Sequence, residues 1–279
     1  MRFDVCIGIL LAAAPAVRAA EDPREVVQHA VEMDRRNAKL AENYTFLERE
    51  DERELDSQGR VKRRTIQTYD ITLSEGSPYR RLVGRNDKPL SSDEELKEQR
   101  KLEKSIAQRR AETPAERAKR LEEWRKQRER GREFQRELLD AFDFRFAAEE
   151  TLNGKRIYVI DGAPKPGYRP KTRAARFLPK LKGRLWIDAE GYNWVKVEAE
   201  VTDTISFYGI AARLSPGSRL FLEQVKVNDE VWLPQRITVK AQARVFLIKK
   251  INTEWEIAFH DYKKFQSDSR ILSMEEETR

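Results

Sequence analysis

The sequence predicts an α+β protein built on one large, curved antiparallel sheet of about ten strands. Three observations support this class. Apolar and polar residues alternate through most of the second half of the chain, in segments separated by short turns. Capping signatures mark an N-terminal helix and a charged helical hairpin inserted among the strands. Runs of strands combined with separate helices are typical of α+β proteins.

Composition limits the classes of protein to consider. The chain has 279 residues, of which 39% are hydrophobic and 37% are charged, and its formal net charge is +7. The charged share is well above the usual value of about 25% and excludes a multi-span membrane protein. A single cysteine excludes a disulfide scaffold. The 12 Phe, 8 Tyr and 5 Trp residues are enough to organise a core, so the composition does not indicate disorder.

Residues 1–19 are predicted to be a signal peptide. Arg2 precedes an apolar stretch at 5–17 that is too short to span a bilayer, and small residues follow it up to Ala19. The alternative is an N-terminal helix or anchor that stays in place. Cleavage would remove Cys6, the only cysteine, and leave a mature chain without thiol chemistry. We therefore expect export to the periplasm.

Three predicted helices begin with the same signature, a capping oxygen three residues before a glutamate. The capping residues are Asp22, Ser92 and Thr113, and a proline follows the first and the third of them. Proline suits the first helical position because its missing N–H leaves no bond unmade there. The first helix is expected to run from about Pro23 to Ala41.

The second and third helices form the predicted inserted hairpin, residues 91–142. Between 91 and 140 the sequence holds 15 Lys or Arg and 13 Asp or Glu, and opposite charges recur at helical spacings. Such a segment is either an arm that binds nucleic acid or a protein partner, or an exposed hairpin docked by a thin apolar stripe. The near balance of charge favours the exposed hairpin, because nucleic-acid binding requires a clear cationic excess.

Most of the remaining chain is predicted to form antiparallel strands. Asn153-Gly154 is the strongest two-residue hairpin signal among the turns. Alternation within the strands predicts one buried face and one solvated face. The predicted strands span 44–55, 61–73, 79–85, 144–151, 155–160, 184–187, 193–201, 219–227, 231–248 and 253–265.

The apolar residues of two strands define a candidate ligand-binding surface on the concave face. Either a packed core or a hollow groove would show this alternation. If the groove is open, it could hold an acyl chain, which gains about 0.8 kcal/mol for each buried methylene. The candidate residues are Val195, Val197, Val201, Ile237, Val239, Val245 and Leu247.

Residues 161–184 are predicted to form a basic loop, because proline and glycine interrupt the strand pattern there. The segment holds eight Lys or Arg and one acid, Asp161. It is either an ordinary solubilising loop or a contact for an anionic surface such as a layer of lipid headgroups. The candidate membrane or anion contacts are Lys165, Arg169, Lys171, Arg173, Arg176, Lys180 and Lys182.

No catalytic site can be argued from the residues. The two histidines, His29 and His260, are too few for a His-rich metal site and are expected to be packing or surface residues. The sequence contains no Gly-x-Ser-x-Gly elbow, Walker loop or dinucleotide fingerprint. We expect no enzyme activity, no cofactor and no metal.

Three short motifs recur in the strand region. Leu185-Trp186-Ile187-Asp188 is followed by a glycine-bearing turn and by Trp194-Val195-Lys196-Val197-Glu198, and Val231-Trp232-Leu233-Pro234 begins the next long strand. Together these motifs resemble the LolA/LolB-like group of outer-membrane lipoprotein-sorting proteins and the N-terminal domain of the MucB/RseB periplasmic regulators, and the resemblance implies an unclosed half-barrel that wraps the N-terminal helix. The resemblance covers roughly residues 23–265. It implies an unclosed, curved sheet around helices, with an apolar space that receives acyl chains. No ligand-contacting residue of the family can be placed on a matching position here.

These observations predict a signal peptide, a single domain at 20–270 and a C-terminal tail at 271–279. The leading hypothesis is a non-enzymatic periplasmic carrier or binder of a lipid or a lipidated protein, in contact with an anionic membrane surface and not with nucleic acid. The alternative is an envelope scaffold or signalling regulator that binds a protein partner through the charged hairpin. A secreted hydrolase is the weakest hypothesis, for want of a nucleophile.

Overall fold

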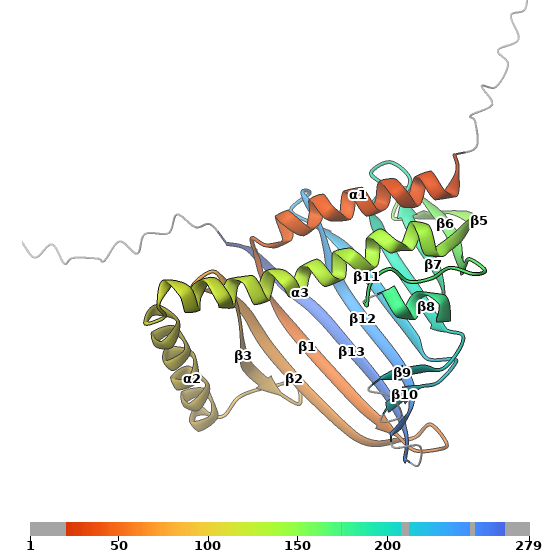
Figure 1. Cartoon of the computed structure of the whole chain (residues 1–279). Coiled ribbons are helices and arrows are strands. Elements are labelled where there is room, and N and C mark those ends of the chain that lie inside the picture. The colour runs from red at the N-terminus through yellow and green to blue at the C-terminus, as the bar shows by residue number, and fades with distance from the viewer. Residues whose placement is uncertain (1–20, 174, 208–211, 246–248, 266–279) are drawn as a thin grey trace, which may run out of the picture.

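The fold is a curved antiparallel sheet with two long helices across one of its faces (Figure 1). The computed structural model describes residues 21–173, 175–207, 212–245 and 249–265. The predicted signal peptide at 1–19 and the tail at 271–279 lie outside these residues. Among the described residues, thirteen strands form one sheet that is not closed into a barrel, which confirms the predicted α+β class.

The structure contains the ten expected strands and three short additional ones, β4, β9 and β10. The order across the sheet is β4-β3-β2-β1-β13-β12-β11-β8-β7-β6-β5, and β10 pairs with both β12 and β9. The strands are β1 (Tyr44–Leu55), β2 (Val61–Ser74), β3 (Ser77–Arg85), β4 (Lys88–Pro89), β5 (Phe142–Leu152), β6 (Lys155–Pro164), β7 (Leu181–Asp188), β8 (Trp194–Val201), β9 (Ile205–Phe207), β10 (Ala212–Leu214), β11 (Arg219–Val227), β12 (Val231–Val245) and β13 (Lys249–Lys264).

Four helices complete the described part of the chain: α1 (Pro23–Ala41), α2 (Ser92–Arg110), α3 (Pro114–Ala141) and the 3-10 helix η1 (Ala175–Lys180). Asp22 and Thr113 cap α1 and α3 as predicted. The cap of α2 is Ser91, one residue before the predicted Ser92, because Ser91 forms the reciprocal capping pair with Glu94. No described helix is long and apolar enough to cross a membrane.

Helix α1 packs on the concave face of the sheet and forms the main core. Its Val26, Val27 and Ala30 are almost completely buried against β6 and β7, where Ile160 and Ile187 are equally buried. Burial of each of these valine and isoleucine side chains contributes about 1.5–3 kcal/mol, so this contact fixes the helix on the sheet. The N-terminal helix is therefore wrapped by the sheet, as the sequence predicts.

The pairing register decides which residues face the helices. Successive residues of a strand point to opposite faces, so a row of paired residues across the sheet stays on one face. One such row crosses nine strands on the concave face, and we call it the floor row. It consists of Phe144, Gly162, Gly183, Ala199, Leu220, Val239, Trp255, Glu52 and Thr65, each paired with the next.

The neighbouring residues on seven of these strands form a charged row on the convex face. Opposite charges alternate along much of this row, and four ion pairs of 3.1–3.9 Å join neighbouring strands. A polar outer face and an apolar inner face are what a half-barrel with a covered interior requires. The charged row consists of Lys182, Glu200, Arg219, Lys240, Glu254, Arg53 and Arg64.

Asp51 is the centre of the ion pairs at one end of the convex face. Its carboxylate is almost completely buried and accepts hydrogen bonds from Arg53 at 2.7 and 3.2 Å and from Arg64 at 2.6 and 2.9 Å. Arg49 lies 3.8 Å from the same carboxylate and also bonds Asp87. These contacts tie β1 to β2 and to the turn after β3.

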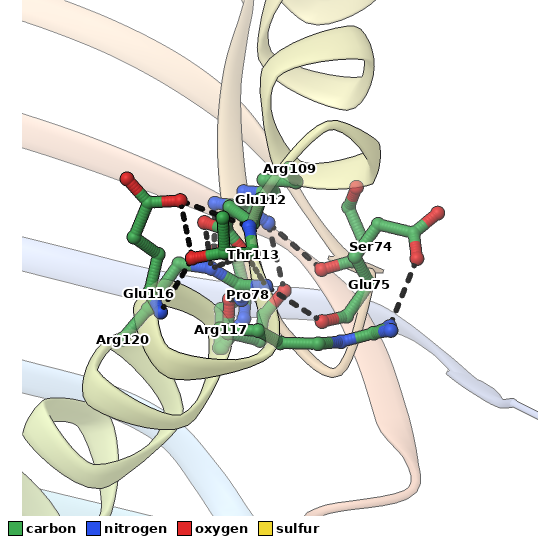
Figure 2. A network of polar contacts seen from close by, with 10 residues as sticks. Ser74, Glu75, Pro78, Arg109, Glu112, Thr113, Glu116, Arg117 and Arg120 are labelled. Carbon is green, nitrogen blue, oxygen red and sulfur yellow. Dashed lines mark hydrogen bonds and ion pairs between the residues drawn. The ribbon is translucent and has the colours of Figure 1, made fainter.

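The corner of the α2–α3 hairpin is fastened to the turn between β2 and β3 (Figure 2). The Arg109 guanidinium donates to the carbonyl oxygens of Ser74 at 2.8 Å and Pro78 at 3.1 Å. Arg120 donates to the Glu112 carboxylate at 2.7 Å and to the carbonyl oxygen of Glu75 at 3.1 Å. These bonds hold the hairpin at a fixed place, although α2 itself has no buried residue.

Residues 161–184, predicted to be a loop without regular structure, contain the end of β6, all of η1 and the start of β7. Pro164 lies beyond Gly162–Gly183, the last β6–β7 pair, so its missing N–H interrupts no bond on that side. Pro179 lies inside η1. The prediction was wrong for these parts, because prolines and glycines at strand ends resemble a loop in sequence.

Replacing Asp51 with Asn is expected to lower the free energy of unfolding by about 2 kcal/mol at pH 7, because the arginines around it lose their shared carboxylate. The guanidinium groups of Arg64 and Arg53 hold the pKa of Asp51 well below its ordinary value. Its stabilising effect is therefore complete above the ordinary value and is lost as the pH falls through the lowered one. Urea unfolding at pH 7, 5 and 3 measures the difference in the free energy of unfolding between the wild-type protein and Asp51→Asn. This difference should be the same at pH 7 and pH 5 and smaller at pH 3.

The control for this comparison is Asp143→Asn, which removes an exposed carboxylate on β5 and should change the free energy by less than about 0.5 kcal/mol. The role given to Asp51 would be contradicted if both variants lost the same free energy of unfolding. It would also be contradicted if the difference between Asp51→Asn and the wild-type protein did not become smaller at pH 3.

Candidate functional site

An apolar cavity of about 530 Å³ lies between the concave face of the sheet and a roof formed by α3 and η1. This volume is within the range of about 300–1,000 Å³ that is usual for small-molecule sites. Strands β5, β6, β7, β8, β11 and β12 form the floor. At the usual strand spacing of about 4.8 Å, a floor of six strands is about 24 Å across, which suits an elongated ligand.

Small residues in the floor explain why the sheet is hollow here. The first six members of the floor row, from Phe144 to Val239, all line the cavity. Gly162 pairs directly with Gly183, and Gly183 pairs with Ala199. These three neighbouring positions carry little or no side chain, and the rings of Phe142 and Phe144 fill part of the space above Gly162, where an added Cβ atom would lie 3.4 Å from each ring.

The roof of the cavity also contains a residue without a side chain, Gly131 of α3. Gly131, Gln135 and Leu138 of α3 line the cavity at helical spacing. Gly131 is exposed, and a Cβ atom added to it would meet no atom within 4 Å, so a larger side chain has room at this position. Phe177 and Leu178 of η1 complete the roof. Helix α3 is therefore more than the exposed hairpin arm that its charge pattern predicts.

Asp34 and Trp194 carry two of the polar groups that line this largely apolar space. Asp34 of α1 lines the cavity and accepts a hydrogen bond from the Gln135 Nε2 at 2.7 Å. Burial raises the pKa of Asp34, against the opposite effect of the bond from Gln135. Trp194 also lines the cavity, and its indole Nε1 has no hydrogen-bond acceptor among the described residues. The remaining surface is dominated by carbon, so the cavity suits an apolar chain.

The structure brings together three of the candidate ligand-binding residues. Val197, Val201 and Val239 line the cavity. Ile237 lies on the same face as Val239, two residues along β12, but outside the cavity lining. Val195 does not line the cavity. Val245 lies on β12, but its side chain is outside the described part of the structure. Leu247 lies outside the described residues.

A bulge in β8 removes Val195 from the cavity. Ile187 of β7 pairs with Trp194, and the next pair joins Trp186 with Lys196, so Val195 is the extra residue between them. The extra residue breaks the alternation and puts Trp194 on the face of Val197. Simple alternation through residues 193–201 therefore predicted Val195 in the place that Trp194 occupies.

Gly131, Gly162 and Gly183 line the cavity but are not among the predicted site residues. In the sequence, Gly162 and Gly183 indicate breaks in regular structure at the two ends of a predicted loop. Glycine within a strand also signals a close approach of backbone or ligand. Two strand glycines paired across the sheet are such a signal, but the pairing is visible only once the register is known.

The predicted basic residues do not form one free cationic surface. Lys171 pairs with Asp140 at 2.6 Å, and Lys180 pairs with Asp203 at 3.0 Å. Lys182 belongs to the charged row and pairs with Glu200 at 3.2 Å. The Lys165 ammonium donates to the carbonyl oxygen of Leu139 at 3.2 Å.

The other three basic candidates, Arg169, Arg173 and Arg176, are exposed. Arg176 lies over the ring of Phe177, with 4.4 Å from its guanidinium carbon to the ring centre. Arg169 and Arg173 have no ion-pair partner among the described residues. A membrane contact by this segment remains a prediction, and these three arginines are the cations available for it.

The segment that carries these arginines is held against α3. Tyr168 donates a hydrogen bond to the buried Glu137 carboxylate, which also accepts the backbone N–H of Lys171 at 2.9 Å. Burial, together with the bond to Glu137, raises the pKa of Tyr168 well above its ordinary value. These two hydrogen bonds hold the segment against α3 and place Arg169, Arg173 and Arg176 beside η1, and thus beside the cavity roof.

The described residues include no group of three or more His, Cys, Asp and Glu that could hold a metal ion. His260 is exposed and its Nδ1 lies 3.1 Å from the Asp261 carboxylate. His29 packs edge-on against the ring of Tyr192, with ring centres 4.8 Å apart.

Reversing Arg169, Arg173 and Arg176 to Glu is expected to weaken binding to vesicles that contain phosphatidylglycerol by more than tenfold, because each basic residue near such a surface contributes about 1 kcal/mol. Co-sedimentation at low salt measures this binding. The matched control reverses Lys97, Arg100 and Lys104, three exposed cations of α2, and should leave binding within about twofold. Equal binding by both variants and the wild-type protein would remove the membrane contact from this segment.

Solved structures from the groups that the motifs resemble are similar to this chain. One, described as an outer membrane lipoprotein-sorting protein domain from Vibrio parahaemolyticus, is 12% identical over 87% of this chain and 94% of that chain, with a TM-score of 0.37. A LolA superfamily protein from Nitrosomonas europaea is 11% identical over 88% and 94%, with a TM-score of 0.30. A chain of the MucA/MucB complex from Pseudomonas aeruginosa is 9% identical over 85% and 99%, with a TM-score of 0.25. No protein-family profile and no curated protein matches the sequence. At these identities the likeness says nothing about a ligand.

Proposed function

We propose that residues 20–270 form a single, non-enzymatic domain that binds or carries an acyl chain, supplied by a lipid or a lipidated protein. The observation that carries this proposal is the apolar cavity between the floor row and α3. Its floor of six strands and its largely apolar lining match a hydrocarbon chain better than a compact polar metabolite.

The energetics support this assignment. Each methylene that enters the cavity contributes about 0.8 kcal/mol, so four methylenes provide about 3 kcal/mol. Because the floor residues are small, the empty fold lacks the stabilising contacts that larger side chains would make there. A ligand that fills the space would recover that energy, and binding would then stabilise the fold.

The proposed place of action is the periplasm. This part of the proposal depends on residues 1–19, which read as a signal peptide. The cell envelope supplies acyl chains from its membranes and lipoproteins. The arginines beside η1 would then face the anionic membrane from which the chain is taken.

The alternative is an envelope scaffold or regulator that binds a protein partner through the hairpin. Helix α2 favours this alternative because none of its residues is buried and Leu96 is 54% exposed. The two functions use different surfaces. A change that blocks the cavity should therefore leave a partner bound to α2 unaffected.

The proposed function is tested by closing the cavity with Gly131→Leu. The new side chain has room, and replacing glycine within a helix should keep or raise stability, by up to about 1 kcal/mol. Titration with octyl, decyl and dodecyl maltoside below their micellar concentrations measures binding. In the wild-type protein the affinity should rise about fourfold for each added methylene, and in Gly131→Leu the dodecyl affinity should fall about 100-fold.

The matched control is Ala118→Leu, which adds the same type of side chain at an exposed position of the same helix. Its affinities should equal those of the wild-type protein. Affinity that does not depend on chain length, or equal affinity in Gly131→Leu and the wild-type protein, would overturn the proposed function.

A further inference from the structure

The floor row does not end where the cavity ends. Val239 is the last of its members to line the cavity, and it pairs directly with Trp255 of β13. Trp255 is 40% exposed and Leu220, on the other side of Val239, is 39% exposed. These two are among the largest exposed apolar side chains in the described part of the protein. The apolar floor therefore continues out of the cavity as an open surface.

The next member of the floor row is an acid. Glu52 of β1 pairs with Trp255, so both side chains lie on the concave face. The distance from Val239 to Glu52 is two strand spacings, about 10 Å. An acyl chain lying along the floor row would thus bring its polar end to Trp255 and Glu52.

Glu52 differs from its neighbours on the same face of β1. Glu50 pairs with Arg80 at 2.6 Å, and Glu54 pairs with Arg63 at 3.4 Å. Glu52 is exposed and has no ion-pair partner among the described residues. Of these three carboxylates, Glu52 in the floor row is therefore the one that is open to a ligand.

We infer that this end of the concave face selects a cationic group, so that the ligand is an acyl-chain amphiphile with a positively charged amine at its polar end. This inference rests on the proposed function, because the acyl chain must lie in the cavity. The amine would lie between the Glu52 carboxylate and the face of the Trp255 ring, both of which attract a cation.

An anionic polar end is disfavoured at the same place. Arg80 and Arg63 already pair with Glu50 and Glu54, and Arg80 also pairs with Glu48 at 2.8 Å. Four carboxylates of β1, including Glu52, thus face two guanidinium groups. A carboxylate or phosphate that ended here would meet a net negative surface.

The test compares three probes with the same chain: dodecylammonium, dodecyl maltoside and dodecanoate, each titrated by calorimetry below its micellar concentration. The wild-type protein should bind dodecylammonium about tenfold more tightly than dodecanoate, and this ratio should fall as salt is added. Glu52→Gln and Trp255→Leu should each weaken dodecylammonium binding about fivefold and leave dodecyl maltoside binding within about twofold.

The matched control is Glu256→Gln, which makes the same charge change one residue after Trp255, on the opposite face of β13. It should leave all three affinities within about twofold. Equal affinity for dodecylammonium and dodecanoate, tighter binding of dodecanoate, or equal effects of Glu52→Gln and Glu256→Gln would overturn the inference while the proposed function stands. Failure of all three probes to bind would overturn both.

Discussion

The pairing register of the antiparallel sheet is the constraint on which the rest of the structure depends. Because neighbouring residues of a strand face opposite ways, one register puts the charged row outside and the floor row inside. A slip by one residue would bury Lys182 and Lys240 and expose Gly183 and Val239. Tight turns with residues at positive φ, such as Asn153–Gly154 and Glu75–Gly76, help to fix the register.

The same register separates a packed part of the interior from a hollow part. Where Ile160 and Ile187 lie in the sheet, α1 covers them with valines and the core is filled. Where Gly162 and Gly183 pair, no side chain rises from the floor, and Gly131 offers none from the roof. The packed core between α1 and strands β6 and β7 thus stabilises the domain, and the cavity next to it is left free for a ligand.

Local sequence signals predicted ten of the thirteen described strands, the three α-helices and two of their three caps, because alternation, capping pairs and turn residues act over a few positions. The same signals could not predict Trp194 in the cavity, since a bulge of one residue in β8 leaves no mark on alternation. Nor could they predict that Lys171 and Lys180 meet Asp140 and Asp203, because these partners are distant in sequence. Hollowness depends on which residues pair across strands, and pairing is a property of the whole sheet.

Native mass spectrometry tests the central claim, that the cavity holds an acyl chain, most directly. The wild-type protein and Gly131→Leu would be purified without detergent from the envelope of the cells that produce them. The wild-type protein should carry a bound lipid or acylated species that dissociates on activation, and Gly131→Leu should give the mass of the chain alone. Two proteins that both give only the mass of the chain, or that both carry the same species, would contradict the claim.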